Sequence, residues 1–239
     1  MPLSLHTHTV GDIAVVACRG RIVEGAEAAA LYQQVRELLP ISHCFVLDLR
    51  DVSFIDSTGL GLLVRLLSRA RGMAGDLKLC SAGVNIEKTL TITRLTTVLR
   101  IYPTEADAIA AFYRTEPGND LPIRAAVDIV CVHSSSDVLA YVRELLRHAG
   151  YAVMTTDNIA SSLTLIRATE PKVVVIEMAL RDRMTGGMPD VFNQYVENVH
   201  VIDLPPNFST DDAGEAGGRL LEQMRRRTPL GSIDVLPWS

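Results

Sequence analysis

The sequence predicts an α/β protein with two sheets: an N-terminal mixed sheet with helices packed on it, and a C-terminal doubly wound parallel sheet. Short apolar runs that are typical of buried strands alternate with longer runs of helical periodicity in both halves. The chain has 239 residues and is 48% apolar, which is typical of globular proteins. A polar segment broken by proline and glycine, residues 114–124, indicates a linker. We therefore expect domains at residues 1–113 and 125–239.

The N-terminal elements are bounded by turn residues, helix breakers and caps. Gly11 and Asp12 separate two strands, and Pro40 ends the first helix. Asn85 is expected to cap one later helix, and Thr104 with Glu105 another. In order, we expect strands at residues 3–10 and 13–23, a helix at 26–39, a strand at 43–51, a helix at 57–72, a strand at 76–80, a helix at 86–92, a strand at 99–102 and a helix at 106–113.

The C-terminal elements alternate in the order strand, helix, strand, helix, strand, which predicts a doubly wound parallel sheet. Ser136 and Asp137 are expected to cap the first helix, and Gly150 ends it. Residues 186–189 and 207–210 are expected to be loops at strand ends, where such sheets usually bind ligands. The expected elements are strands at 127–132, 151–155, 172–177 and 199–204, and helices at 136–148, 158–168 and 212–227.

Composition excludes several classes of protein. The net charge of −5 gives no indication of nucleic-acid binding. No apolar run approaches the roughly 20 residues of a membrane span, and the N-terminus does not resemble a signal peptide. His6 and His8 would share a strand face but have no third ligand in view, so we expect neither metal nor cofactor. Four separated cysteines indicate buried free thiols in a reducing cytoplasm: Cys18, Cys44, Cys80 and Cys131.

Ser57 lies where a buried strand, residues 45–51, passes through a short connection into a helix. Backbone N–H groups at a helix N-terminus are unsatisfied and partly positive, so they would hold a phosphate on this hydroxyl. The charge of Asp56 would repel the same phosphate. This combination suits a reversible switch. The alternative is that Asp56 and Ser57 are an ordinary helix cap.

The helix that begins at Ser57 has unusual features in its first turns. Gly59 and Gly61 each cost a helix about 1 kcal/mol relative to alanine, which is explicable if another backbone or a bulky ligand comes close. Apolar residues at core spacing are Leu60, Leu63, Val64, Leu67 and Ala70. A second stripe mixes apolar and basic residues and is a candidate partner surface: Leu62, Arg65, Leu66 and Arg69. The alternative is a wide apolar face with solvated arginines.

The order of elements over about residues 3–113 resembles the STAS domain, the fold of bacterial anti-sigma-factor antagonists. The segments that carry the resemblance are Cys18–Ile22, Leu47–Gly61, Gly75–Leu79 and Leu90–Leu95. The resemblance implies that Ser57 is phosphorylated by a partner serine kinase, which is often itself the anti-sigma factor. It also implies that a metal-dependent serine phosphatase reverses the modification. Unphosphorylated antagonist would bind the kinase and free the sigma factor, whereas phosphorylated antagonist would release it.

The sequence departs from the family at one position near the serine. Sporulation-type members usually carry an acid after the Gly-x-hydrophobic segment, whereas Val23 takes that place here and Glu24 follows it. STAS domains also occur in anion transporters and in stress-sensing scaffolds. The lack of a membrane-spanning run argues against the transporters.

The second half resembles a response-regulator receiver domain through residues 129–132, 143–151 and 171–176. Aspartyl phosphorylation needs a carboxylate nucleophile, an acid pair for Mg²⁺, a hydroxyl and a lysine. His133 and Ser134 stand where the acid pair belongs, Glu177 stands at the acceptor position, and no lysine follows Lys172. We therefore expect a pseudo-receiver that keeps the fold and lacks the chemistry. The alternative is a generic flavodoxin-like domain.

The leading hypothesis is a cytoplasmic, non-enzymatic regulatory switch that is phosphorylated at Ser57. It would bind a serine kinase or anti-sigma factor, but neither nucleic acid nor membrane. The expected partner-binding residues are Asp56, Ser57, Thr58, Gly59, Gly61, Leu62, Arg65 and Leu66. The second hypothesis is a scaffold in which Ser57 is only a helix cap. A hydrolase with Ser57 as nucleophile is disfavoured, because Ile55 replaces the elbow glycine and His43 precedes the strand.

Overall fold

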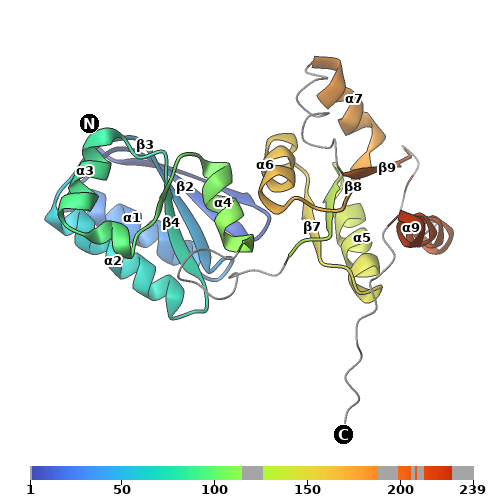
Figure 1. Ribbon diagram of the computed structural model, residues 1–239, viewed down its shortest axis with the longest axis horizontal. Coiled ribbons are helices and arrows are strands. Elements are labelled where there is room, and N and C mark those ends of the chain that lie inside the picture. Colours follow the sequence, from blue (N-terminus) through green and yellow to red (C-terminus); the bar gives the residue numbers. More distant parts are fainter. Residues whose placement is uncertain (1, 115–125, 188–198, 206–207, 209–212, 228–239) are drawn as a thin grey trace, which may run out of the picture. The chain divides into compact units, whose positions relative to one another are not determined.

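The computed structural model describes residues 2–114, 126–187, 199–205, 208 and 213–227. The chain divides into two compact units, residues 1–125 and 126–239. Each unit carries its own sheet (Figure 1). The fold class expected from the sequence, a mixed sheet followed by a doubly wound parallel sheet, is confirmed. Most of the expected linker lies outside the described residues.

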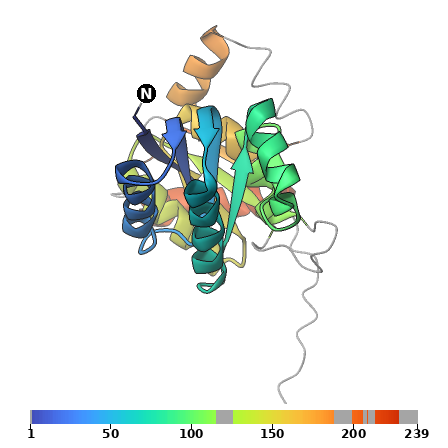
Figure 2. The same cartoon turned by 90° about the vertical axis from the view of Figure 1, so that its left-hand side faces the viewer.

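The sheet of the first unit has five strands in the order β1-β2-β3-β4-β5. Strand β1 is antiparallel to β2, and the remaining pairs are parallel. Helices α1, α2 and α3 cover one face, and α4 packs against the other (Figures 1 and 2). The element bounds are β1 Ser4–Val10, β2 Ile13–Ile22, α1 Ala26–Leu38, β3 Cys44–Ile55, α2 Ser57–Arg71, β4 Asp76–Cys80, α3 Val84–Ile92, a 3-10 turn η1 Leu95–Thr97, β5 Ile101–Tyr102 and α4 Glu105–Tyr113.

The core of the first unit lies between the sheet and the three helices on its first face. Phe45 and Leu47 of β3 are fully buried there, against Leu63 and Leu67 of α2 and Leu31 of α1. Alternate residues of each strand face this layer, as expected for a sheet covered by amphipathic helices. The packing fixes α2 along the middle of the sheet, so the N-terminal turn of α2 lies at the carboxyl ends of the parallel strands.

The sheet of the second unit has four parallel strands in the order β7-β6-β8-β9. Helices α5 and α9 share a core with one face, and α6 packs against the other (Figure 1). Gly217 lets α9 approach α5 closely, since a Cβ there would lie 2.3 Å from the Tyr141 hydroxyl oxygen. The bounds are β6 Ile129–Val132, α5 Ser136–His148, β7 Val153–Thr156, α6 Ile159–Thr169, β8 Val173–Glu177, α7 Met178–Gly187, β9 His200–Leu204 and α9 Ala213–Arg227.

Several expected element ends are wrong. Gly83 rather than Asn85 is the N-cap of α3, and Asn85 lies inside the helix. The hydroxyl of Ser135, one residue before the expected caps, accepts from the Val138 N–H and caps α5. Strand β3 runs to Ile55 instead of residue 51, because its last residues pair with β2.

Helix α7 was not expected from the sequence. It begins directly after β8, and its C-terminal residues Gly186 and Gly187 were expected to be in a loop. The rest of that expected loop, residues 188–189, lies outside the described residues, as do residues 207 and 209–210 of the other expected loop.

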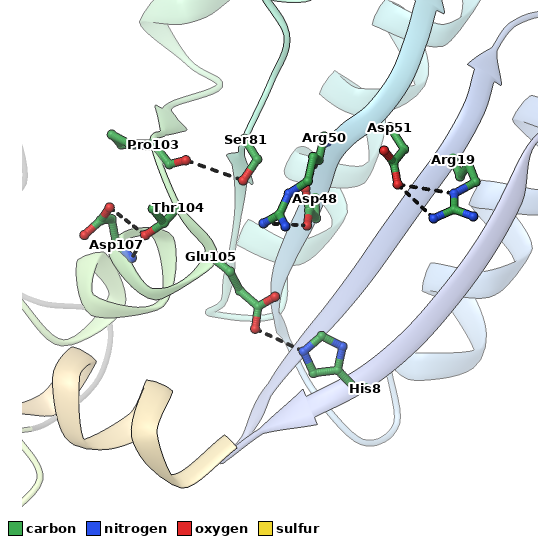
Figure 3. Close-up of polar contacts among 10 residues, drawn as sticks. All are labelled: His8, Arg19, Asp48, Arg50, Asp51, Ser81, Pro103, Thr104, Glu105 and Asp107. Carbon is green, nitrogen blue, oxygen red and sulfur yellow. Dashed lines mark hydrogen bonds and ion pairs between the residues drawn. The ribbon is translucent and has the colours of Figure 1, made fainter. Parts of the chain in front are cut away.

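One polar contact ties the edge strand of the first unit to α4. His8 Nε2 lies 3.0 Å from Glu105 Oε1, which joins β1 to the first turn of α4 (Figure 3). The Thr104 side chain caps the same helix by accepting from the Asp107 N–H at 3.1 Å. The hydrogen bond to Glu105 raises the pKa of His8, although partial burial opposes the shift. Protonated His8 therefore stabilises the contact between β1 and α4.

This contact predicts a pH-dependent contribution to stability. A raised native pKa means that the contribution is fully present below the unfolded value of 6.5 and is lost as the pH rises through the raised native pKa. Glu105→Gln should therefore lower the free energy of unfolding most at acidic pH and least at alkaline pH. Urea denaturation between about pH 5.5 and 8.5 measures this difference. In a His8→Gln background the same substitution should have no pH-dependent effect; a constant difference in both backgrounds would contradict the prediction.

Candidate functional site

Asp56 lies at the junction between β3 and α2 and organises it. Its backbone is extended (φ −90°, ψ −177°), so it is the last residue outside the helix. Its Oδ1 accepts a hydrogen bond from the Gly59 N–H at 2.7 Å. This is the geometry of an N-cap, which satisfies one of the free N–H groups of the first turn. The helix cap expected under the alternative is therefore present, but Asp56 and not Ser57 provides it.

The second oxygen of the same carboxylate binds another loop. Asp56 Oδ2 accepts from the Glu24 N–H at 2.9 Å, and the Asp56 N–H donates to the Ile22 carbonyl at 3.3 Å. Hydrogen bonds from the Gly59 and Glu24 backbones lower the pKa of Asp56. The carboxylate is therefore ionised at neutral pH and links the β2–α1 loop to the β3–α2 junction. Glu24, which follows Val23 in the sequence, therefore lies directly beside the serine loop.

Ser57 is the first residue of α2, and its side chain is exposed. Within the described residues, no hydrogen bond engages its hydroxyl. Thr58 is also exposed, and its N–H contributes to lowering the pKa of Asp56. An exposed hydroxyl without an internal partner at a helix N-terminus is accessible to a modifying enzyme.

The two glycines of the first turns have different surroundings. A Cβ on Gly59 would lie 2.3 Å from the Ile22 carbonyl oxygen and 2.8 Å from Ile55 Cγ2. Gly59 is therefore required by the close approach of another backbone within the chain, which is one of the two reasons expected from the sequence. A Cβ on Gly61 would have nothing within 4 Å. Packing among the described residues does not explain Gly61.

The candidate partner stripe on α2 is only partly exposed. Leu62 is 8% exposed and Leu66 is 1% exposed, and both belong to the core of the first unit. The prediction that these two leucines lie on a partner surface is wrong, because α2 packs against the sheet and against α1 and buries a wide apolar face. The exposed face of α2 consists of Ser57, Thr58, Gly61, Arg65, Ser68 and Arg69.

Two residues beside the serine were not expected from the sequence. Phe54, near the end of β3, is 47% exposed, and the Arg21 guanidinium lies 5.1 Å from the centre of its ring. Residues 21 and 54 are cross-strand partners, which explains this contact. The sequence signal for this contact was an aromatic residue, Phe54, two positions before Asp56.

In the second unit, the three residues of the expected degenerate receiver pocket lie together at the carboxyl ends of β6 and β8. Glu177 Oε2 accepts from the Ser134 N–H at 2.9 Å and lies 3.9 Å from His133 Nδ1. The Ser135 N–H donates to the same His133 nitrogen at 2.9 Å. Burial lowers the pKa of His133. For Glu177, burial acts to raise the pKa, but the hydrogen bonds with Ser134 outweigh it and the pKa is lowered. The site therefore pairs a neutral imidazole with a carboxylate.

A further ion pair near this end of the sheet depends on the helix that the sequence did not predict. Arg181 of α7 binds Asp203 of β9. This pair was not expected from the sequence. Helix α7 begins at the residue directly after Glu177. The sequence therefore has no turn residues between strand and helix that would have indicated the start of α7.

In the part of the chain that the structure describes, no group of three or more histidine, cysteine or acidic side chains could hold a metal ion. No described helix is long and apolar enough to cross a membrane. All four cysteines are buried and free. Burial raises the pKa of Cys18, Cys80 and Cys131 to about 12, so these three are neutral thiols at physiological pH.

Comparisons with known proteins show similarity to one family. Residues 4–108 match the family described as the STAS domain. A relative from Thermotoga neapolitana, named "Putative anti-sigma factor antagonist TM1081 homolog", is 36% identical over 64 residues. That match covers 27% of this chain and 57% of the relative, so the chain matches little more than half of the relative's length.

Two solved structures are also similar to the first unit. TM1081 from Thermotoga maritima is 25% identical with a TM-score of 0.42, covering 44% of this chain and 91% of that one. An anti-sigma factor antagonist from Mycobacterium paratuberculosis is 24% identical with a TM-score of 0.42, covering 46% of this chain and 92% of that one.

The two glycines provide a matched pair of substitutions within one turn. Gly59→Ala should lower the free energy of unfolding by about 1–3 kcal/mol, because the new methyl group would overlap the Ile22 carbonyl. Gly61→Ala should raise it by up to about 1 kcal/mol, because the methyl group meets open space and alanine favours the helix. Urea denaturation followed by circular dichroism measures both changes. Equal destabilisation by both substitutions would contradict the contrast.

Proposed function

We propose that this chain, in which residues 4–108 form a STAS domain, is a regulatory switch of the anti-sigma-factor-antagonist kind controlled by reversible phosphorylation of Ser57. The observation that carries the proposal is the exposed, unpartnered Ser57 hydroxyl in the first turn of α2. The name of the Thermotoga neapolitana relative supports the same class of function. The protein would act by binding partners in the cytoplasm rather than as an enzyme.

A phosphate on Ser57 would compete with Asp56 for the helix N-terminus. The phosphate adds a charge of about −1.5 to −2 beside an ionised carboxylate, and both groups favour the same free N–H groups. Asp56 already accepts from Gly59 and Glu24. We expect repulsion to weaken the bond to the Glu24 N–H and so to change the β2–α1 loop. The modification would thereby alter two neighbouring loops at once.

The expected partner is a serine kinase that also acts as an anti-sigma factor, and a serine phosphatase would restore the free hydroxyl. The kinase has to reach Ser57, so its contact surface includes the exposed residues of the junction. We assign to this surface Asp56, Ser57, Thr58, Gly61 and Arg65. Gly61 fits this role because internal packing among the described residues does not require it. Gly59 contributes only by allowing α2 to approach β2.

The second unit is proposed to be a pseudo-receiver that modulates this contact or recruits another partner. His133 and Ser134 replace the acid pair that would bind Mg²⁺, and Glu177 already accepts from the Ser134 N–H. A carboxylate held by an internal donor, without neighbouring acids, is poorly suited to accept a phosphoryl group.

A scaffold without a phosphorylation switch is the second candidate function. The arrangement of His133 and Glu177 favours it, since a domain that has lost phosphotransfer chemistry can still dock partners. The two functions differ in the role of Ser57: the switch requires its hydroxyl, and the scaffold does not.

The switch predicts a phosphate on Ser57 whose amount changes with growth condition. Intact-mass and phosphosite analysis of the protein from its own cells, with and without stress, measures this. Ser57→Ala should abolish the modification and retain partner binding under all conditions, because the hydroxyl is lost without added charge. Ser57→Asp should weaken partner binding by repulsion from Asp56.

Ser68→Ala is the matched control for Ser57→Ala, because Ser68 is an exposed serine on the same helix that is not assigned to the contact surface. It should leave the regulated change in binding intact. Absence of phosphate on Ser57 under every condition, with every condition-dependent change in partner binding retained in Ser57→Ala, would select the scaffold instead.

The pseudo-receiver assignment predicts no acyl phosphate on the second unit. Incubation of the full chain with acetyl phosphate and Mg²⁺ should add no mass to the peptide that contains Glu177, whereas an intact receiver domain treated in parallel should gain a phosphoryl group. Phosphate on Glu177 in the wild-type chain, lost in Glu177→Gln, would contradict the assignment.

A further inference from the structure

Three arginines and one tyrosine form a basic cluster on the outer surface of α1 and α2. The Arg65 guanidinium carbon lies 4.2 Å from the centre of the Tyr32 ring, and Arg69 Nη1 donates to the Tyr32 hydroxyl oxygen at 3.5 Å. Arg36, one turn after Tyr32 on α1, is close enough for its positive charge to lower the pKa of the same hydroxyl. The two helices lie side by side on one face of the sheet (Figure 2). We call Tyr32, Arg36, Arg65 and Arg69 the basic cluster.

The arginines of the basic cluster have no carboxylate partner among the described residues. Elsewhere in the first unit, two exposed arginines pair with acids, Arg19 with Asp51 and Arg71 with Asp76. Two others, Arg21 and Arg94, are exposed without a carboxylate partner among the described residues but do not lie in a group of three. The chain has 28 acidic and 23 basic residues, so unpaired arginines concentrated at one place contrast with its overall charge. The hydrogen bond with Arg65, together with the positive charges of Arg69 and Arg36, lowers the pKa of Tyr32.

The exposed face of α2 connects Ser57 to the basic cluster. The exposed residues of α2 before Arg65 are small: Ser57, Thr58 and Gly61. Arg65 lies eight residues after Ser57, about 12 Å along the helix axis. The exposed residues between the serine and the guanidinium groups therefore carry no long side chain.

We propose that the basic cluster docks an acidic segment of a protein partner, whose carboxylates bind Arg65 and Arg69 beside Tyr32. Guanidinium groups bind carboxylates through paired N–H donors, and the unpaired arginines supply such donors on an open surface. The origin of the acidic segment, in the kinase that acts on Ser57, rests on the proposed function. The preference of the basic cluster for negative charge does not rest on the proposed function, so this preference can be tested with this chain alone.

The test is a titration of the ¹⁵N-labelled full chain with a hexaglutamate peptide, followed by NMR. The Nε–Hε signals of Arg65 and Arg69 should shift in a saturable manner. Because the contact is electrostatic and exposed, the apparent Kd should rise when the salt concentration increases from about 50 to 200 mM. The charge-reversed variant Arg65→Glu/Arg69→Glu should raise the apparent Kd at least about fivefold.

The matched control is Arg143→Glu/Arg225→Glu, which makes the same charge change at exposed arginines of the second unit. Its affinity for hexaglutamate should equal that of the wild type. Circular dichroism should show that both variants are folded, as expected for exposed positions. An equal loss of affinity in both variants, or no shift at Arg65 and Arg69 in the wild type, would overturn the proposal.

Other anions define the remaining outcomes. If inorganic phosphate binds the same arginines as tightly as hexaglutamate does, the basic cluster is a site for a small phosphate group. That result would overturn the proposal that it docks an acidic segment. Binding to phosphatidylglycerol vesicles that is lost in Arg65→Glu/Arg69→Glu would assign it to a lipid surface and overturn it too. If hexaglutamate binds as expected but Ser57 is never phosphorylated, the proposed switch fails and the docking surface stands.

Discussion

The carboxylate of Asp56 holds together the part of the molecule where function is proposed. One oxygen caps α2 through the Gly59 N–H, and the other binds the Glu24 N–H of the preceding loop. The approach is possible only because Gly59 has no side chain to overlap the Ile22 carbonyl. A short capping residue and a glycine three positions later therefore fix the start of the helix against the sheet. Ser57 lies between them, outside this network, with its hydroxyl free for chemistry.

The sequence predicted the fold class because that class depends on local patterns. Alternating strand and helix periodicities determined both sheets, and the breakers Gly11 and Pro40 lie where elements end. The caps were predicted less well, because several polar residues near the start of a helix have side chains that could act as its N-cap. Asn85 and Ser136 lie one or two residues from the true caps at Gly83 and Ser135. The path of the chain brings the Ser135 hydroxyl to a free N–H group of α5, whereas at Gly83 no side chain caps α3.

The candidate site was predictable where it depends on neighbours in sequence and unpredictable where it depends on packing. Asp56, Ser57 and Gly59 follow from one continuous motif. The burial of Leu62 and Leu66 does not, because helical periodicity gives the angle between two faces but not the width of the surface that α1 and the sheet cover. The contact of Arg65 with Tyr32 joins residues on two helices, and no local pattern indicates it. The same applies to the pairing of Arg21 with Phe54 across two strands.

Distance decides how a phosphate on Ser57 would act on binding. The basic cluster begins about 12 Å along α2, beyond the Debye length of about 8 Å at physiological salt, so the phosphate would be largely screened from it. Asp56 is the adjacent residue and its carboxylate is bound to the Glu24 loop, so repulsion there is only weakly screened. Phosphorylation would therefore act through the junction and its two loops, whereas the arginines would contribute an affinity that is the same in both states. Switching and docking would then be properties of different residues on one helix.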